Sequence, residues 1–369
     1  MAGDGAESDL AEIAARRLQG QRLIGEPFSS ALEAIRSFGA VQAQDYGAAK
    51  WALGQRSVGA TDAELDRLFD QGAILRTHVM RPTWHFVLPE DVGWLLELTG
   101  PKVLAGLNGR HRQLELDADV LALSQAAFGA ALAGGRHLTR TELGGVLRAA
   151  GIAADGPRLH HLILTAELER LIVSGPRRGR QFTYALLEER VPPTSRMERT
   201  DAIVELARRY FLSHGPAQLH DFVWWSGLTA TDARAGVALA GDALQRQMAG
   251  SREHWRDARV GPAPDASSVA HLLPNFDEYT VAYRDRAALV DPHRPFDPAF
   301  FSFGSVISNV VTIAGRVQGR WRRTAARRGV RVEVDLLSRV EAAAEASIAE
   351  AGRRLERFLE RPVEVALGG

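Results

Sequence analysis

The chain has 369 residues, no cysteine and a formal net charge of zero. This length allows two or more domains, the lack of cysteine excludes disulfides, iron–sulfur clusters and thiolate zinc sites, and the zero net charge argues against a protein coated with positive charge. Roughly eighteen consecutive apolar residues would be needed to span a membrane, and no such run occurs; the polar start of the chain also lacks a signal-peptide core. We therefore expect a cytoplasmic protein with no membrane association.

The first part of the chain predicts three short helices followed by a β-hairpin. Apolar spacing and capping residues predict helices at Ser8–Gln19, Ser29–Gly39 and Thr61–Gly72. Two β-type runs, Ile74–Val79 and Thr83–Leu88, flank a short turn. Helices followed by a hairpin are the order of elements that a winged helix has.

The same order of elements recurs twice. In the second copy, Thr139 and Glu142 form a capping-box signature, another helix follows, and the strands of LIVSGPRRGRQFTYALL flank a basic turn. After the linker VPPTS, three helical segments precede two candidate strands, Ala243–Met248 and Arg252–Asp257. The copies match in layout and not in residue identity, so the sequence predicts three degenerate repeats of one small unit.

Residues 262–369 have a different character. They contain one long helix, at about Ser338–Leu359, and several short β-type runs: VAHLLP, YTVAY, SNVVTIAG, RVQGRWRR, RVEVDLL and PVEVAL. Many short strands with glycine turns indicate a small barrel or sandwich. The predicted fold is therefore α+β, with three tandem winged-helix units at residues 8–88, 89–190 and 197–258 and a small C-terminal β-barrel at residues 262–369.

The stretch VQAQD places Gln42 and Gln44 two residues apart, shortly after Gly39. In an extended segment such residues face the same way, so both amides would project onto one surface while Val41 and Ala43 face inward. An amide is a poor general base, but it can hold a water molecule. That suffices where the leaving group departs readily, as a purine alkylated at N7 does because of its fixed positive charge. The alternative is a pair of glutamines that caps a loop.

Three groups of residues are candidates for contact with a nucleic acid. The first lies on the first hairpin, the second at the basic turn of the second repeat, and the third in an acid-free stretch that surrounds Trp321. They are, in that order, Arg76, His78, Arg81, Thr83 and His85; Arg177, Arg178 and Arg180; and Arg320, Arg322 and Arg323. The alternatives are structural histidines and solvated turns in an arginine-rich protein.

Two adjacent carboxylates, Asp277 and Glu278, could perform acid–base chemistry. The simpler explanation is a local set of ion pairs with Arg284 and Arg286. No spacing of histidines or carboxylates typical of a metal site is present, and no phosphate-binding glycine loop occurs. We therefore expect no metal and no cofactor.

Several stretches together resemble the AlkZ-like family of bacterial winged-helix DNA glycosylases. They are GAVQAQD, LRTHVMRPTWHFVLPED, GPAQLHDFVWWSGLT, LLPNFDEYTVAYRDR and GRVQGRWRR. The resemblance covers nearly the whole chain and implies three tandem winged helices, a C-terminal β-barrel and a Gln-x-Gln catalytic motif at Gln42 and Gln44. A related branch has aspartate at the second motif position. In this chain Asp45 lies one residue later and is expected to cap the following helix. The role of the motif aspartate in the related branch is therefore not assigned to Asp45.

The resemblance implies removal of N7-alkylated purines from double-stranded DNA, including purines in interstrand crosslinks. The protein is expected to act as a monomer. The alternatives are a non-catalytic winged-helix DNA-binding regulator and an enzyme that acts on another nucleic acid or on a nucleoside. Three repeats and a glutamine pair suit a regulator poorly, because a typical regulator has one winged helix and a dimerisation or ligand-binding domain.

Overall fold

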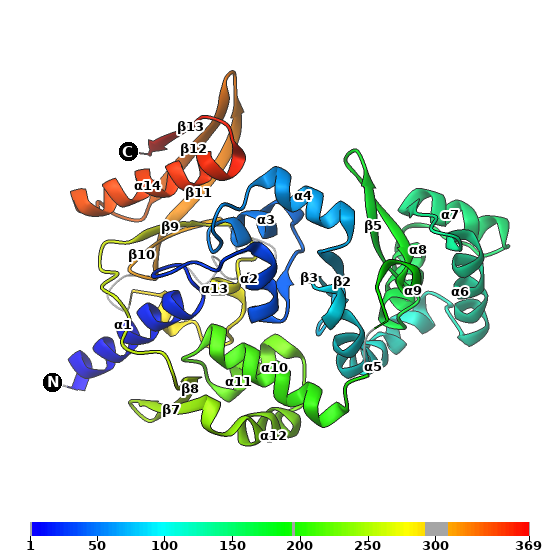
Figure 1. The fold of residues 1–369 in the computed structure, drawn as a ribbon, viewed down its shortest axis with the longest axis horizontal. Helices are drawn as coiled ribbons and strands as arrows, with labels where there is room; N and C mark the ends of the chain where they lie inside the picture. Colours follow the sequence, from blue (N-terminus) through cyan, green and yellow to red (C-terminus); the bar gives the residue numbers. More distant parts are fainter. Residues whose placement is uncertain (1, 194–195, 292–308, 369) are drawn as a thin grey trace. The chain divides into compact units, whose positions relative to one another are not determined.

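The computed structural model describes residues 2–193, 196–291 and 309–368 and divides into two compact units (Figure 1). Unit 1 comprises Met1–Leu65 and Ile203–Gly369, and unit 2 comprises Asp66–Ala202. Both units contain helices and strands, so the predicted α+β class is confirmed. Among the described residues, no helix is long and apolar enough to cross a membrane.

The chain enters unit 1 through four helices and one short strand. They are α1 (Ala2–Gly20), α2 (Ala31–Phe38), β1 (Val41–Gln42), α3 (Tyr46–Gly54) and α4 (Asp62–Gln71), the last of which continues into unit 2. Ser30 caps α2 by accepting a hydrogen bond from the Glu33 backbone N–H, and Gly39, with a φ of 83°, ends it. The predicted start of the first helix at Ser8 is wrong, because the alanine and glutamate residues before it continue the helix.

Unit 1 resumes with three helices and a hairpin. These are α10 (Arg199–His214), α11 (Leu219–Ser226), α12 (Ala230–Ala240), the 3₁₀ turn η1 (Gly241–Ala243), β7 (Leu244–Ala249) and β8 (Arg252–Asp257). The two strands pair antiparallel, with Leu244 opposite Asp257. The predicted order of three helices and a hairpin is therefore confirmed, with β7 displaced by one residue.

A five-stranded sheet closes unit 1, in the order β13-β12-β11-β10-β9. Its elements are β9 (Ala270–Leu273), α13 (Glu278–Val281), η2 (Ala287–Leu289), β10 (Val310–Ile313), β11 (Arg316–Ala326), β12 (Gly329–Leu336), α14 (Ala342–Leu359) and β13 (Val363–Leu367). Helix α14 packs against β9 and β13 (Figure 1). This sheet corresponds to a half-barrel, which agrees in part with the predicted C-terminal β-barrel. The run YTVAY is not a strand: Asp277 caps a helical turn there by accepting from the Tyr279 N–H at 2.9 Å.

Unit 2 contains two hairpins and a helical layer. Its elements are β2 (Leu75–Val79), β3 (Thr83–Val87), α5 (Pro89–Gln113), α6 (Ala118–Leu132), β4 (Leu138–Thr139), α7 (Arg140–Ala149), α8 (Gly156–Leu168), β5 (Ile172–Arg178), β6 (Gln181–Leu186) and α9 (Leu187–Arg190). The hairpin β2–β3 and the capping box of Thr139 with Glu142 are as predicted. Leucines of α6, α7 and α8 pack with Ile172 and Tyr184 into one core beneath the sheet β4-β6-β5.

Candidate active site

The glutamine motif lies between two helix caps in unit 1. Gly39 ends α2, the chain runs extended through Val41 and Gln42, and Asp45 begins α3 by accepting a hydrogen bond from the Ala48 N–H at 3.0 Å. Val41 and Ala43 are buried, as the extended pattern predicted. The carboxylate of Asp45 is occupied as a cap, which also agrees with the prediction.

The two glutamines have different surroundings. Gln44 is exposed, whereas only 6 % of Gln42 is accessible to solvent. The Gln42 side-chain oxygen Oε1 is buried and accepts no hydrogen bond from any described residue. An unsatisfied buried acceptor costs about 1–3 kcal/mol and calls for an explanation, one of which is a bound water or substrate.

Helix α3 holds the motif against the C-terminal part of unit 1. The ring of Trp51 packs on that of Phe358 in α14, with 5.2 Å between centroids, and its Nε1 donates to the Leu272 carbonyl at 2.8 Å. Gly54 faces the same phenylalanine so closely that a Cβ there would overlap the ring. This close packing fixes the helix that follows the motif.

A buried carboxyl group, Glu278, lies directly behind Gln42. Its Oε1 accepts from the Gln42 backbone N–H at 2.6 Å, and its Oε2 accepts from Trp225 Nε1 at 2.9 Å. His214 Nε2 lies 3.4 Å from the same Oε2. Glu278 is 1 % exposed, and two N–H donors on its two oxygens are the arrangement that suits an ionised carboxylate.

The neighbouring carboxylate, Asp277, belongs to a buried ion pair. Both of its oxygens accept from Arg56, at 2.6 and 2.9 Å, and Arg56 also donates to Gln21 Oε1. The predicted pairing of Asp277 with Arg284 and Arg286 is therefore wrong, because Arg56, in the turn that follows α3, supplies the guanidinium group. Sequence reasoning had no local signal for these contacts: Gln42 and Glu278 are 236 residues apart.

Three buried carboxyl groups lie in this part of unit 1: Asp221, Asp277 and Glu278. Arg56 forms an ion pair with Asp277, and the Arg17 guanidinium group lies 3.7 Å from the Asp221 carboxylate. Glu278 accepts from two N–H donors and lies beside the His214 ring. The backbone of Gln42 is therefore held by a buried carboxyl group.

One of the three C-terminal arginine candidates is paired with a carboxylate. Glu333 pairs with Arg322 at 2.6 Å, and Trp321 is a core residue whose Nε1 donates to the Leu273 carbonyl. The adjacent strand β12 thus supplies a carboxylate to a stretch that contains no acidic residue of its own. Arg320 is exposed. Arg323 reaches the start of α3: its Nη2 lies 3.5 Å from the position that a Cβ of Gly47 would take.

The five hairpin candidates of unit 2 do not converge on one point. His78 packs on Trp84, 4.0 Å between ring centroids, and its Nδ1 lies 2.7 Å from Glu167 Oε2. His85 is fully buried on the opposite face of the hairpin, where its Nδ1 lies 2.9 Å from the Thr83 carbonyl oxygen. Arg76 shares the face of His78 and Trp84, and Arg81 is half-buried in the turn.

The turn between β5 and β6 carries Arg177, Arg178 and Arg180, called the arginine turn below. Arg177 donates to both oxygens of Asp70, and this contact lowers the pKa of Asp70. Arg178 binds Glu142 at 2.7 Å, and that hydrogen bond, followed by those from Thr139, lowers the pKa of Glu142 to about 2. Arg180 is exposed and has no carboxylate partner within the described ranges.

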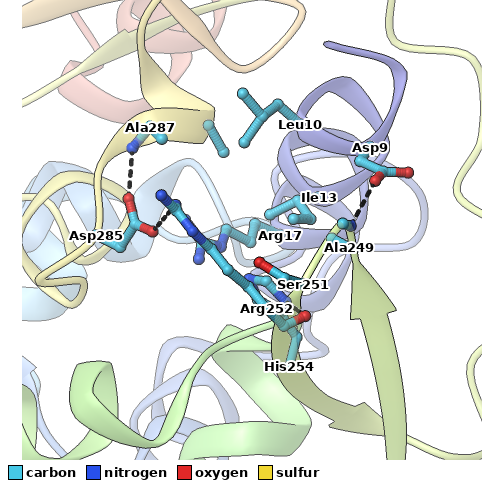
Figure 2. Close-up of a pocket in the computed structure, with 12 residues that line it drawn as sticks. Asp9, Leu10, Ile13, Arg17, Ala249, Ser251, Arg252, His254, Asp285 and Ala287 are labelled. Atoms are coloured by element: carbon cyan, nitrogen blue, oxygen red, sulfur yellow. Dashed lines mark hydrogen bonds and ion pairs between the residues drawn. The ribbon is translucent and has the colours of Figure 1, made fainter. Parts of the chain in front are cut away.

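A separate cavity in unit 1, of about 290 Å³, lies between α1 and the hairpin β7–β8 (Figure 2). Several of its polar groups are paired with one another. Asp285 accepts from Arg252 at 2.6 Å and from the Ala287 N–H, and Asp9 accepts from the Gly250 N–H at 2.9 Å (Figure 2). The glutamine motif is not part of its lining, and the paired charges indicate a structural role.

The family model described as DNA glycosylase AlkZ-like matches residues 35–358, so the chain belongs to the AlkZ-like DNA glycosylase family. It is thus a DNA glycosylase, a hydrolase of N-glycosyl bonds that acts on DNA. A similar solved structure is the DNA glycosylase AlkZ of Streptomyces sahachiroi, with 21 % sequence identity, a TM-score of 0.77 and coverage of 97 % of this chain and 99 % of that chain. At this identity the likeness shows the fold. A search of curated protein sequences finds no match.

Proposed function

We propose that this glycosylase removes N7-alkylated purines from double-stranded DNA, including purines in interstrand crosslinks, with Gln42 and Gln44 as catalytic residues. The observation that carries the proposal is the buried Oε1 of Gln42, which has no partner among the described residues and lies two positions from an exposed second amide. Such an acceptor suits a water molecule held for attack. The motif also lies inside the stretch that the family model matches.

In the proposed reaction, water attacks C1′ of the deoxyribose while the bond from C1′ to N9 breaks. The purine leaves with the bonding electron pair, which neutralises the positive charge that N7-alkylation gave it. The water loses one proton to solvent and becomes the hydroxyl group of an abasic site. Because the departing base needs no proton, an amide that only positions water is sufficient.

The carboxyl group of Glu278 supports this chemistry electrostatically. Bond breaking places positive charge on the sugar, as in glycoside hydrolysis. Glu278 lies behind the Gln42 backbone, buried and bound by two N–H donors. A fixed negative group in a buried site stabilises nearby positive charge and needs no reorganisation as the reaction proceeds. Glu278 is therefore proposed as a positioning residue whose charge also favours the cationic sugar.

The remaining features of the proposal concern architecture and biology. The order α6–β4–α7–α8–β5–β6 supports a winged helix at residues 89–190, and we propose two more at residues 8–88 and 197–258, followed by the barrel-like domain at residues 262–369. The protein acts as a monomer in base excision repair. Unhooking of crosslinks would protect a cell that makes a DNA-alkylating antibiotic.

The test is release of N7-methylguanine from a defined duplex, followed by alkali to cleave the abasic sites. Gln42→Ala is expected to slow base release by about 100-fold or more, in the range found for loss of a positioned catalytic group, and Gln44→Ala by a similar factor. Gln55→Ala is the matched control, because Gln55 is also a buried amide without hydrogen-bond partners in the described structure but lies outside the motif.

Two outcomes would contradict the proposal. Equal rates for wild type and Gln42→Ala would remove the glutamine pair from the mechanism. Tight binding of the methylated duplex without base release, together with activity on another lesion, would assign a different substrate. A second substrate, a duplex with a nitrogen-mustard crosslink between two N7 atoms, tests unhooking by the appearance of separated strands.

A further inference from the structure

A second cavity, of about 320 Å³, lies wholly within unit 2. This volume is in the range of small-ligand sites, roughly 300–1,000 Å³. The lining combines basic, aromatic and hydroxyl-bearing side chains: Arg76, Arg140 and Arg180; Trp84, Phe182 and Tyr184; and Thr139, Thr141, Ser174 and Thr183 with Gln181. None of the described residues that line it is acidic.

The aromatic rings fix one of the three arginines. The guanidinium carbon of Arg76 lies 4.4 Å from the centroid of the Trp84 ring and 4.9 Å from that of Phe182. Its backbone N–H donates to Ser174 Oγ at 2.8 Å, which ties β2 to β5. An arginine stacked on aromatic rings has a restricted orientation. Arg76 therefore places a fixed positive charge in the lining of the cavity.

Arg140 and Arg180 have no carboxylate partner among the described residues. Arg140 is exposed, and the one hydrogen bond seen for its side chain goes to the Gly156 carbonyl at 3.3 Å. Arg180 is exposed and, as described above, unpaired within the described ranges. The neighbouring Arg177 and Arg178 are both bound to carboxylates and do not line the cavity. Among the described residues, the charges of Arg140 and Arg180 at the cavity are therefore not compensated by a carboxylate.

We propose that this cavity binds one nucleotide unit, with the phosphate held by Arg140 and Arg180, the positive charge of Arg76 in the same lining, and the base packed against the exposed parts of Phe182 and Trp84. Arginine forks match phosphate oxygens, and the half-buried rings offer the apolar surface that a nucleobase requires. The nucleotide is either an unstacked unit of a DNA strand or a free nucleotide. The first source rests on the proposed action on DNA, and the second does not.

Calorimetric titration of the full-length protein with dGMP, 2′-deoxyguanosine and inorganic phosphate tests the site directly. We expect dGMP to bind at least tenfold more tightly than either fragment, because the cavity contacts both parts of the molecule. No detectable binding of dGMP, or equal affinity for dGMP and 2′-deoxyguanosine, would overturn the proposal. The assay contains no alkylated base, so its outcome is independent of whether the glutamines catalyse base release.

Variants locate the site. Arg180→Gln and Arg140→Gln are each expected to weaken dGMP binding about fivefold or more, as loss of a charge-assisted hydrogen bond does. Arg148→Gln is the matched control, since Arg148 is an exposed residue of the same helix as Arg140 but does not line the cavity. Because Arg180 is exposed, its replacement leaves the core intact. The same affinity for Arg180→Gln and Arg148→Gln would disprove the assignment.

Competition distinguishes the two sources of the nucleotide. One competitor is an undamaged blunt-ended duplex, and the other is the same duplex with a short single-stranded overhang. Displacement of dGMP by the overhang duplex alone assigns the cavity to an unstacked nucleotide of DNA. Retention of dGMP against both duplexes assigns it to a free nucleotide. Displacement by both duplexes to the same extent would show that general DNA binding covers the cavity and would overturn a site for an unstacked nucleotide.

Discussion

The glutamine site of unit 1 and the arginine turn of unit 2 differ in how their polar groups are satisfied. At the glutamine site, the charged Arg56 and Asp277 are buried and paired, while a neutral atom, Gln42 Oε1, has no partner in the described structure. At the arginine turn, Arg177 and Arg178 are bound to carboxylates near the surface. A buried unsatisfied acceptor is costly, whereas an exposed ion pair contributes little. The neutral amide is therefore the stronger indication of function.

This contrast also separates two uses of charge. Beneath the glutamines, the paired charges are buried. Their electrostatic interaction is strong there because the interior has a low dielectric constant. At the arginine turn, the charged groups lie near the surface. Ion pairs with carboxylates there leave less positive charge to bind DNA phosphates. A count of arginines along the sequence consequently overstates the free positive charge of a surface.

The largest expected effect concerns the buried pair beneath the glutamine site. Arg56→Met should leave Asp277 as an uncompensated buried carboxylate and lower the free energy of unfolding by about 3–5 kcal/mol. Arg178→Met, at an ion pair of similar length on the surface of unit 2, should leave the unfolding midpoint unchanged. Chemical denaturation followed by circular dichroism measures both. Similar losses for the two variants would remove the distinction between buried and surface charge.

The next effect concerns the charge behind Gln42. Glu278→Gln keeps the size of the side chain but removes the negative charge, so base release from N7-methylguanine DNA should slow by about 10- to 100-fold, which corresponds to about 1.4–2.7 kcal/mol. Single-turnover rates at saturating enzyme provide the measurement.

The control for that experiment is Trp225→Phe, which removes the N–H donor to Glu278 Oε2 but keeps the charge and most of the ring. It should destabilise the protein by about 0.5–1.5 kcal/mol and affect base release less than Glu278→Gln does. If both variants slow base release equally, Glu278 acts through packing alone.

Local capping and turn chemistry made much of the fold predictable from the sequence. The hairpin strands β2 and β3 lie within one residue of their predicted ends, Gly39 ends α2, and Asp45 begins α3 as expected. Each of these features depends on residues within about four positions of one another. The extended glutamine segment with buried Val41 and Ala43 follows from the same local rules.

Contacts between distant residues account for what the sequence did not predict. Glu278 meets Gln42 and Trp225 across 236 and 53 residues, and Glu333 meets Arg322 across a strand pair. The run YTVAY has the composition of a strand, but its first three residues belong to the helical turn α13, which Asp277 caps. Periodicity cannot separate a short buried strand from a short buried helix.

A smaller effect concerns pH and the histidines of unit 2. Burial, and then the charges of His78, His161 and Arg140, lowers the pKa of His160 from 6.5 to about 4. The unfolded chain therefore takes up the proton more readily than the folded chain, so the stability that the neutral ring contributes is present above about pH 6.5 and is lost as the pH falls toward 4.

The loss in that range should be about 1 kcal/mol, since the partly exposed ring is screened by solvent. His160→Gln should flatten the dependence of the unfolding midpoint on pH between 4 and 6.5. The same substitution at another histidine of unit 2, His137→Gln, is the control. An unchanged profile for His160→Gln would show that other groups of unit 2 dominate the titration.

The smallest effect tests the arginine turn itself. Affinity for an undamaged duplex falls with salt, and each phosphate contact adds about 0.9 to the slope of log K against log salt. Arg180→Gln should lower that slope by about 0.9, because Arg180 has no carboxylate partner within the described ranges. Arg178→Gln should lower it by much less, because Glu142 already binds this guanidinium group at 2.7 Å.

A third variant tests whether the ion pair with Glu142 is the reason that Arg178 contributes little to the slope. Glu142→Gln releases the charge of Arg178 and can still cap α7, because glutamine satisfies the same capping box with Thr139. The slope should then rise above that of wild type, by up to about 0.9. Fluorescence anisotropy over a series of salt concentrations measures all three slopes. If Glu142→Gln leaves the slope unchanged while Arg178→Gln lowers it as much as Arg180→Gln, the ion pair opens on DNA binding and the arginines of the turn are equivalent.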